Sequence, residues 1–410
     1  MNGNRIKNAL AVGLALVAGG LFAQAPVTIS YMNFSGAGDM SPNLTKMKEA
    51  FEKRNPGIKV NIETFAYADY FTQLQTRAAA GKLSDAFELN YENFVAYAKR
   101  GALLDLASVG ADTKGLAPKA VEAFAYAGKQ YGLPESFSTV LLFYNQALFD
   151  RAKVGYPNSD WTWKDVQAAA EKIRALDKTI YGIYQPVQFW EFYKLVKQNG
   201  GSLVSADNKK FTVNSPANVA TLTNIVERYT KSNVSPTSAQ MGGVGDWDLF
   251  KSGRLGMIVT GIWAFNEFIR DCDFPWDVAV EPGNTARATH FFSNGIVVSK
   301  TAKNAKAAAA WAQFMASSNE AANIRLDASW ELPAVTSPEI MAKYTKAPVP
   351  ASRWAVYESL NYLVTPVVID QNQEMVDILN QQLTAAKEGT KTPAQALSDA
   401  QKDLASKIKL

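Results

Sequence analysis

The sequence is poor in the residue types that build metal centres and nucleophilic sites. Its 410 residues include one cysteine, Cys272, and one histidine, His290. A lone thiol cannot form an internal disulfide, and a lone imidazole cannot build a histidine–cysteine metal cluster. HExxH, GxSxG and phosphate-binding glycine loops are also missing. We therefore expect no metal, no cofactor and no catalytic residue. Cys272 is expected to be a small buried or half-buried side chain, and His290 a polar loop residue.

The chain also lacks an apolar run long enough to cross a membrane, which needs about 20 residues. The run from Ala9 to Phe22 is shorter, follows Arg5 and Lys7, and precedes Ala23-Gln24-Ala25. This layout predicts a secretory signal peptide over residues 1–25, cleaved after Ala23 or Ala25. An N-terminal membrane anchor is the alternative. Because no cysteine lies near the cleavage site, no lipid anchor is expected, and the sequence favours a soluble periplasmic protein.

Neither sign of charge dominates. The formal net charge is +4 and falls to +2 without the signal peptide, and acidic and basic residues are interspersed. The sequence therefore shows no basic stripe for nucleic acid. About 385 residues remain after cleavage, too many for one hydrophobic core, so two domains are expected.

Strand and helix patterns alternate along the chain. We expect buried or alternating strands at 27–34, 58–64, 87–89, 140–144, 181–184 and 255–260. Helices are expected at 41–53, 67–80, 93–99, 191–198, 216–231, 246–252, 302–317 and 371–387, and one capped by Thr162 that runs to Ile173. This alternation is typical of a parallel or mixed sheet with helices on both faces.

Several short motifs follow one another in a characteristic order. Gly132-Leu133-Pro134 leads to Tyr144-Asn145, and Thr162-Trp163 opens a helix. Phe250, Met257 and Gly261-Ile262-Trp263 follow, and then Gly295–Lys300. This order resembles that of family 1 extracellular solute-binding proteins, the sugar-binding components of ABC importers, over nearly the whole mature chain. The maltose-binding type of periplasmic protein belongs to that group.

The resemblance implies an α/β protein with the two-lobed periplasmic-binding-protein fold. Each lobe would be a mixed sheet flanked by helices, and hinge strands would join the lobes. Matching the segments places residues 26–137 with 297–335 in an N-terminal lobe and 138–296 with 336–410 in a C-terminal lobe. A monomer would bind a carbohydrate between the lobes and close around it. It would then deliver the sugar to an inner-membrane ABC permease.

A sugar site needs flat aromatic rings against the faces of the pyranose and planar polar groups at its hydroxyls. Such residues are expected where strands end and helices begin. The best candidates by position are Trp263 and Trp190. Together with weaker candidates, the resemblance points to Trp263, Trp190, Gln188, Glu191, Tyr91, Glu92, Asn93, Asn33, Phe34, Ser35, Glu135, Ser138, Asp246, Trp247, Asn294, Trp330 and Glu331.

Each assignment has a structural alternative. Trp263 could be a core residue, and Tyr91, Glu92 and Asn93 could be the ordinary first turn of a helix. Ser138 falls where some relatives carry a carboxylate, which puts that contact in doubt. Packing is the favoured role for the remaining tryptophans, Trp161, Trp163, Trp276, Trp311 and Trp354.

Other functions stay open at this point. Glu92 and Glu331 could face each other as the carboxylate pair of a periplasmic glycan hydrolase or lyase. The family also has members for glycerol phosphates and other polar solutes. A binding protein could also present its ligand mainly to a chemoreceptor.

Overall fold

The structure is a computed structural model that describes residues 25–369 and 371–410. All but the last residue of the expected signal peptide therefore lie outside the described residues. Within these ranges no helix has the length and apolarity that a membrane span requires. No group of three or more histidine, cysteine, aspartate or glutamate side chains in the same ranges is arranged to hold a metal ion.

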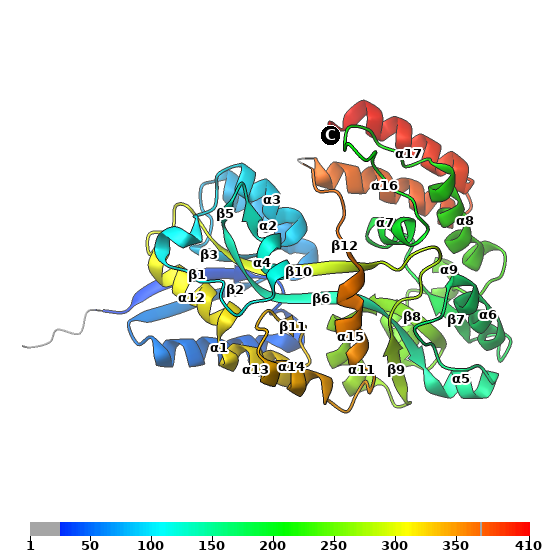
Figure 1. The fold of residues 1–410 in the computed structure, drawn as a ribbon, viewed down its shortest axis with the longest axis horizontal. Helices are drawn as coiled ribbons and strands as arrows, with labels where there is room; N and C mark the ends of the chain where they lie inside the picture. Colours follow the sequence, from blue (N-terminus) through cyan, green and yellow to red (C-terminus); the bar gives the residue numbers. More distant parts are fainter. Residues whose placement is uncertain (1–24, 370) are drawn as a thin grey trace, which may run out of the picture.

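The protein is α/β and has two lobes joined by long strands, as Figure 1 shows. A ten-stranded mixed sheet extends through both lobes in the order β2-β1-β3-β10-β6-β8-β7, with β9 and β11 paired to β6 and β12 to β10. Its strands are β1 (Val27–Asn33), β2 (Ile58–Thr64), β3 (Ala86–Asn90), β6 (Gly132–Asn145), β7 (Tyr181–Tyr184), β8 (Leu255–Gly261), β9 (Trp276–Ala279), β10 (Thr289–Val298), β11 (Leu332–Pro333) and β12 (Leu363–Val364). The pair β4 (Ala125–Tyr126) and β5 (Lys129–Gln130) forms a separate hairpin.

Helices cover the sheet on both sides. Those formed by the first half of the chain are η1 (Gly38–Met40), α1 (Ser41–Arg54), α2 (Tyr67–Ala79), α3 (Tyr91–Lys99), η2 (Leu106–Val109), α4 (Pro118–Ala123), α5 (Gln146–Ala152), α6 (Trp163–Arg174) and α7 (Phe189–Gln198). The later ones are α8 (Pro216–Thr230), α9 (Ser238–Met241), α10 (Asp246–Lys251), η3 (Ile262–Ala264), α11 (Phe265–Asp271), α12 (Ala305–Ser317), α13 (Asn319–Asp327), α14 (Pro338–Thr345), α15 (Trp354–Ser359), η4 (Leu360–Tyr362), α16 (Asn372–Lys387) and α17 (Pro393–Lys407).

The first lobe is built around β1, β2 and β3, and the alternation of β1 decides what packs on each face. Ile29 and Tyr31 lie in one core cluster with residues of α1 and α12. Met32 faces the opposite way, in a cluster with residues of α2, α3 and α4. Because successive side chains of a strand point to opposite faces, one short strand serves both helical layers.

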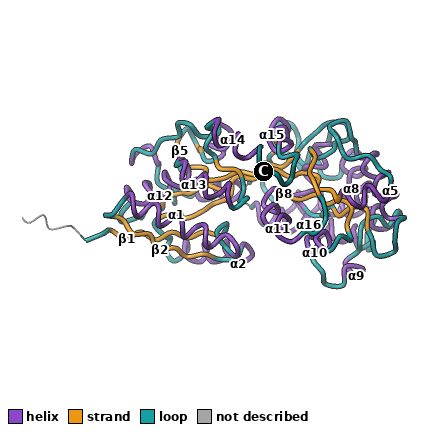
Figure 2. Tube along the Cα trace, turned by 90° about the horizontal axis from the view of Figure 1, so that it is seen from below, coloured by secondary structure: helices purple, strands orange, loops and turns teal. Residues whose placement is uncertain are grey.

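The second lobe is built around β7, β8 and β9. Its sheet packs α5 and α6 on one face through residues such as Leu142 and Val259, and α10 and α11 on the other through residues such as Phe143. A further layer of α7, α8, α16 and α17 has its own buried core. Figure 2 shows the two lobes side by side, with α1 and α2 in one and α5 and α8 in the other.

The strand β6 passes from one lobe to the other. Its first part, Gly132–Thr139, pairs antiparallel with β10. From Val140 on it pairs with β8, and from Leu142 also with β9. All 14 of its residues are buried. The strand is thus much longer than the expected 140–144, and Glu135 and Ser138 lie within it instead of before it.

The return strand β10 also differs from the sequence-based expectation at one residue. His290 lies inside this strand and is fully buried, not in a loop. Trp354 is likewise no packing residue, because half of its surface (50%) is exposed on α15. The other element positions are confirmed within a few residues, including the helix that follows Thr162 and the half-buried Cys272. The residue bounds of the two lobes stay a prediction.

Candidate functional site

Three half-buried aromatic side chains meet where the two lobes join. Trp190 comes from the first turn of α7, Trp263 from η3 after β8, and Phe292 from the hinge strand β10. The Phe292 ring lies edge-on to Trp263, 5.2 Å between centroids, and to Trp190, 6.4 Å away. We call Trp190, Trp263 and Phe292 the aromatic trio. It offers exposed ring surface from three elements at one place.

A close backbone approach holds Trp263 in the trio. Gly261 ends β8 with an extended backbone, at φ −90° and ψ 166°. A Cβ atom built on Gly261 would lie 1.9 Å from Cζ3 of Trp263, well inside van der Waals contact. The glycine therefore makes room for the indole ring, and its role does not depend on backbone flexibility.

Asp246 and Trp247, the first two residues of α10, lie beside the end of β8. The Trp247 indole donates from Nε1 to Oγ1 of Thr260, 3.3 Å away, and its ring packs on Phe268. Both Asp246 and Trp247 are half-buried. Burial raises the pKa of the Asp246 carboxyl above its usual value. Burial and then the charge of Asp246 raise the pKa of Tyr184, at the end of β7, to about 12. The strand ends of the second lobe thus combine aromatic rings with a carboxyl group.

The expected residues of β1 are tied into the first lobe. The Asn33 amide donates to Oγ1 of Thr64, 3.0 Å away, and its Oδ1 accepts from the backbone N–H of Gly36. The backbone N–H groups of Phe34 and Ser35 both donate to Oε2 of Glu88. These contacts fix the turn after β1 and occupy the polar groups of Asn33.

Tyr67, which the sequence reasoning missed, lies beside that turn. Its ring contacts Phe34 at 5.3 Å, 56% of its surface is exposed, and its Oη accepts from the Asn90 amide. An exposed aromatic residue at the start of α2, next to a polar strand end, is the kind of group that covers a sugar face. The one available signal was its position as the first residue of the helix expected at 67–80.

The residues after β3 divide between two roles. Asn90 caps α3 and accepts hydrogen bonds from both the backbone and the side-chain amide of Asn93. Glu92 does not take part in this cap. It is buried, and its Oε1 lies 3.2 Å from Nε2 of His290. The His290 ring contacts both Trp190 and Phe292. Glu92 of the first lobe therefore reaches the aromatic trio through His290.

The polar partners expected next to Trp190 are arranged differently. Glu191 is buried and accepts from Gln185 (2.6 Å) and from Lys194, which also contacts Glu281. Burial raises the pKa of the Glu281 carboxyl. Gln188 precedes α7 and is exposed. Glu191 thus belongs to a network inside the second lobe, while Gln188 stays accessible.

A second buried polar cluster lies in the first lobe and contains Glu135. Its Oε2 accepts from Arg325, 2.7 Å away, and the Arg325 guanidinium lies 4.3 Å over the Trp330 ring. Burial and then the charge of Glu135 hold the pKa of Glu88 well above its usual range. These contacts indicate that Glu135 and Trp330 have internal partners.

Glu331 lies at the edge of that cluster. It is half-buried, and its Oε2 accepts from Ser136 at 2.5 Å and from the Asn294 amide at 3.4 Å. Burial raises the pKa of the Glu331 carboxyl. Asn294 lies on β10, two residues after Phe292. Ser138 lies on β6, directly opposite Phe292. The polar groups of Ser138 and Asn294 are buried and lie on the same two strands as Phe292 of the trio.

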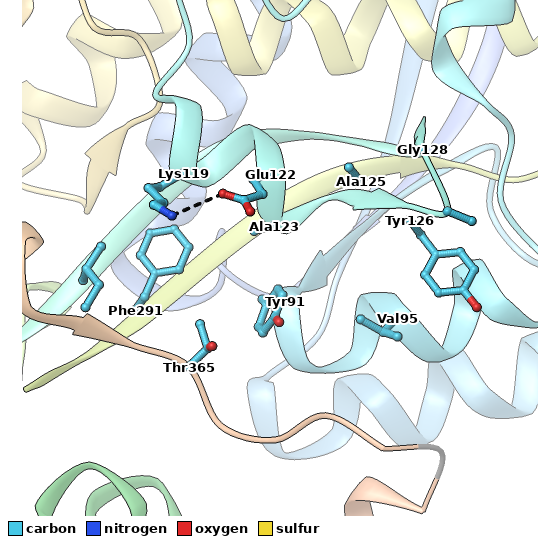
Figure 3. A pocket seen from close by; sticks show the side chains of 12 residues that line it. Tyr91, Val95, Lys119, Glu122, Ala123, Ala125, Tyr126, Gly128, Phe291 and Thr365 are labelled. Carbon is cyan, nitrogen blue, oxygen red and sulfur yellow. Dashed lines mark hydrogen bonds and ion pairs between the residues drawn. The ribbon is translucent and has the colours of Figure 1, made fainter. Parts of the chain in front are cut away.

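Tyr91 faces a different space. It lines a cavity of about 500 Å³ together with Lys119, Glu122, Phe291 and Thr365, as Figure 3 shows. Phe291 and Phe292 are successive residues of a strand, so their side chains point to opposite faces. The structure therefore separates Tyr91 from the aromatic trio.

One ion pair joins the lobes at their surface. Asp39, in η1 after β1, contacts Arg270 of α11, and each side chain is more than half exposed. Because the pair connects the first lobe to a helix packed on β8 and β6, it reports on how close the lobes lie.

The structure thus brings together Trp190, Trp263, Glu92, Asn294, Ser138 and Glu331 around the hinge strand, with Asp246 and Trp247 at the neighbouring strand ends. Phe292 and His290, the residues that connect them, were not predicted. Their signal was the period-two spacing of His290, Phe292 and Asn294, which places the three side chains on one face of a strand.

Comparison with known proteins agrees with this architecture. The chain is 45% identical to an ABC substrate-binding protein from Listeria monocytogenes whose structure was determined in complex with cycloalternan. That alignment covers 93% of this chain and 99% of that one, with a TM-score of 0.89. The GacH receptor of Streptomyces glaucescens, 21% identical over 93% of this chain and 98% of that one, has the same fold at a TM-score of 0.83.

A curated relative is the diacetylchitobiose-binding protein DasA of Streptomyces coelicolor, 27% identical over 59% of this chain and 56% of its own length. Residues 37–322 match the family described as bacterial extracellular solute-binding protein. The match extends over more than half of the chain, which therefore belongs to the bacterial extracellular solute-binding protein family.

Proposed function

We propose that this protein is the extracytoplasmic solute-binding component of an ABC importer and binds a carbohydrate between its lobes. The observation that carries the proposal is the aromatic trio, which presents ring surface from both hinge and second lobe beside the carboxyl and amide groups of Glu331 and Asn294. Rings that cover apolar sugar faces and planar groups that pair with hydroxyls are what a pyranose requires.

The ligand class follows from the same residues and from the relative crystallised with cycloalternan. We infer an oligosaccharide, with cycloalternan as the first compound to test. The protein acts as a monomer in the periplasm, exported by its signal peptide, and delivers its ligand to an inner-membrane permease. Ligand contacts with both lobes favour the closed arrangement.

A binding role is favoured over catalysis. Oε1 of Glu92 contacts His290, and Oε2 of Glu331 contacts Ser136 and Asn294, so one oxygen of each carboxylate is already engaged by a different set of side chains. A hydrolase would release new reducing ends from a linear glycan incubated with the protein, and we expect none.

Calorimetric titration with cycloalternan, maltodextrins, glycerol phosphate and amino acids tests the proposal. We expect a dissociation constant in the micromolar range or below, about −8 kcal/mol or stronger, for one of the sugars. Binding of glycerol phosphate or an amino acid without any sugar would contradict the carbohydrate assignment. Loss of uptake upon deletion of the protein would separate transport from a purely chemosensory role.

Trp263→Ala is expected to weaken sugar binding by more than about tenfold without loss of the fold, because it removes a ring of the trio. The matched control is Trp354→Ala, since Trp354 is half exposed on α15 and outside the trio. Equal affinities of both variants with the wild type would place Trp263 among the core residues.

A further inference from the structure

The only histidine of the chain lies in a buried row of side chains that spans the hinge. His290 of β10 is fully buried between Glu92 of α3 and Tyr193 of α7, which are 3% and 2% exposed. Its Nε2 lies 3.2 Å from Oε1 of Glu92, and its Nδ1 lies 2.5 Å from Oη of Tyr193. Tyr193 Oη also lies 3.1 Å from the backbone oxygen of Val364 in β12. We call Glu92, His290 and Tyr193 the hinge relay.

The donors and acceptors of the relay fix the direction of its hydrogen bonds. An ionised carboxylate only accepts, so the bond to Glu92 requires the proton of a neutral imidazole on Nε2. Nδ1 is then an acceptor, and the hydroxyl of Tyr193 must donate to it. A second acceptor for the Tyr193 hydroxyl is the backbone oxygen of Val364, which takes the hydroxyl proton when Nδ1 is itself protonated.

The surroundings favour the neutral imidazole. Burial lowers the pKa of His290, and the positive charge of Lys194 acts in the same direction against the pull of Glu92. Around Tyr193 the charged groups are Glu92 of α3, Glu191 of α7 and Glu281, with Tyr91 close by. Lys194 neutralises part of this charge by pairing with Glu191 and Glu281.

One atom of the relay has no partner. Among residues 25–369 and 371–410, no hydrogen-bond donor reaches Oε2 of Glu92, although that oxygen is buried. A buried carboxylate oxygen without a partner is costly unless another donor satisfies it. Glu92 lies next to the aromatic trio, because the ring of its partner His290 contacts both Trp190 and Phe292. The oxygen without a donor thus belongs to a carboxylate that is one side chain away from the trio.

We propose that His290 and Tyr193 are positioning residues that hold Glu92 by its Oε1, so that Oε2 accepts a hydroxyl of the bound sugar. Tyr193 donates to Nδ1 of His290, and His290 donates from Nε2 to Glu92. Because the three residues come from the first lobe, the hinge strand and the second lobe, the bond to the ligand depends on how the lobes are placed. The proposal rests on the proposed function, since it names how one carboxylate recognises the sugar.

Nuclear magnetic resonance tests the proton positions directly, because the sole histidine gives one imidazole signal in protein without a histidine tag. In ¹⁵N-labelled protein at neutral pH we expect the tautomer protonated on Nε2, and titration below the ordinary pKa of 6.5. In Tyr193→Phe we expect the signal to shift and the pKa to change. A tautomer protonated on Nδ1, or a signal that is unchanged in Tyr193→Phe, would overturn the relay.

Affinity distinguishes positioning from a structural role. Tyr193→Phe removes a single oxygen, and we expect cycloalternan or the best-bound sugar to bind about tenfold more weakly, since Glu92 loses its fixed orientation. Tyr229→Phe is the matched control, because Tyr229 is also buried in the second lobe and donates its hydroxyl to the Gln185 backbone. We expect Tyr229→Phe to leave both the affinity and the imidazole signal unchanged.

Circular dichroism first verifies that Tyr193→Phe and Tyr229→Phe are folded. If Tyr193→Phe then bound the sugar with the same affinity as the wild type, the positioning role would be overturned. Failure of the proposed function looks different: the wild type itself would bind no sugar. The positioning role would then fall with it, while the imidazole signal would still report whether the relay exists.

Discussion

At the scale of single residues, the candidate site depends on an atom that is missing at one residue and on a hydrogen-bond donor that is missing at another. Gly261 has no Cβ where the Trp263 ring lies, and Oε2 of Glu92 has no donor within the described part of the chain. Some buried charges of the second lobe are fully engaged, as Lys194 is with Glu191 and Glu281. Arg228 is partly engaged, since its guanidinium donates to Gln185 while its Nε has no partner among the described residues. Because buried polar groups are normally paired, an oxygen without a donor that lies beside the aromatic trio is a candidate for a ligand contact.

Gly261→Ala is expected to move the Trp263 ring out of the trio, because the new methyl group would lie within 1.9 Å to 2.2 Å of three ring carbons. Sugar affinity measured by calorimetry should fall by about tenfold or more, as in a loss of the aromatic contact. The backbone at Gly261 is extended and suits alanine, so the fold should persist.

The control for this change is Gly57→Ala, where no atom lies within 4 Å of the added carbon. We expect wild-type affinity for that variant. If Gly261→Ala also bound normally, the ring position of Trp263 would have no bearing on the ligand.

At the scale of elements, the predicted helices and strands agree with the structure where the apolar pattern is regular. The helix after Thr162 is an example: its expected cap forms, and Asp165 accepts from both N and Oγ1 of Thr162 at 2.8 Å and 2.7 Å. The pattern failed in β6, whose first half includes Glu135, Ser136 and Ser138. A single sequence does not show that Arg325 and Glu331, almost 200 positions later, bond to Glu135 and Ser136.

The candidate site could be predicted only in part, again because a single sequence does not show which remote residues contact each other. Trp190 and Trp263 follow recognisable strands, so their positions at strand ends could be read from the pattern. Glu191 has the same kind of position, yet its carboxylate pairs with Lys194, and that choice depends on the distant Glu281. Whether a residue at such a position faces a ligand depends on the direction of its side chain within the helix turn and on which remote partners it meets.

Asp165→Ala tests the cap of α6. It removes the acceptor of two hydrogen bonds, so we expect a loss of about 1 kcal/mol in the free energy of unfolding, measured with denaturant at neutral pH. Asp165→Glu should retain most of the stability of the wild type, because glutamate occupies the same position in capping boxes.

The effect should also depend on pH. The bonds to Thr162 lower the pKa of Asp165, so the folded state holds the proton less tightly than the unfolded state. This stabilisation is present above the ordinary value of 3.8 and is lost as the pH falls through the lowered pKa. A constant difference between wild type and Asp165→Ala down to the acid limit of folding would contradict this account.

At the scale of the whole molecule, two kinds of contact connect the lobes. The hinge strands β6 and β10 and the relay through His290 are buried. Salt in the solvent therefore affects these contacts little. The Asp39–Arg270 pair lies at the surface and has more than half of each side chain in solvent. Such exposed pairs are screened by salt and contribute about 0–1 kcal/mol. The pair is therefore suited to adjust the balance between open and closed arrangements without deciding it.

Arg270→Ala should weaken sugar binding by about twofold to fivefold at low ionic strength, because the closed arrangement loses one attraction between the lobes. At about 1 M salt the difference from the wild type should vanish, since the pair is then screened. Lys119→Ala is the matched control: it removes an exposed ion pair, with Glu122, inside one helix of the first lobe. Small-angle scattering of both variants with and without sugar gives the accompanying change in shape. A loss of affinity that is as large at high salt as at low salt would mean that Arg270 acts on the ligand or on α11 itself, and not through Asp39.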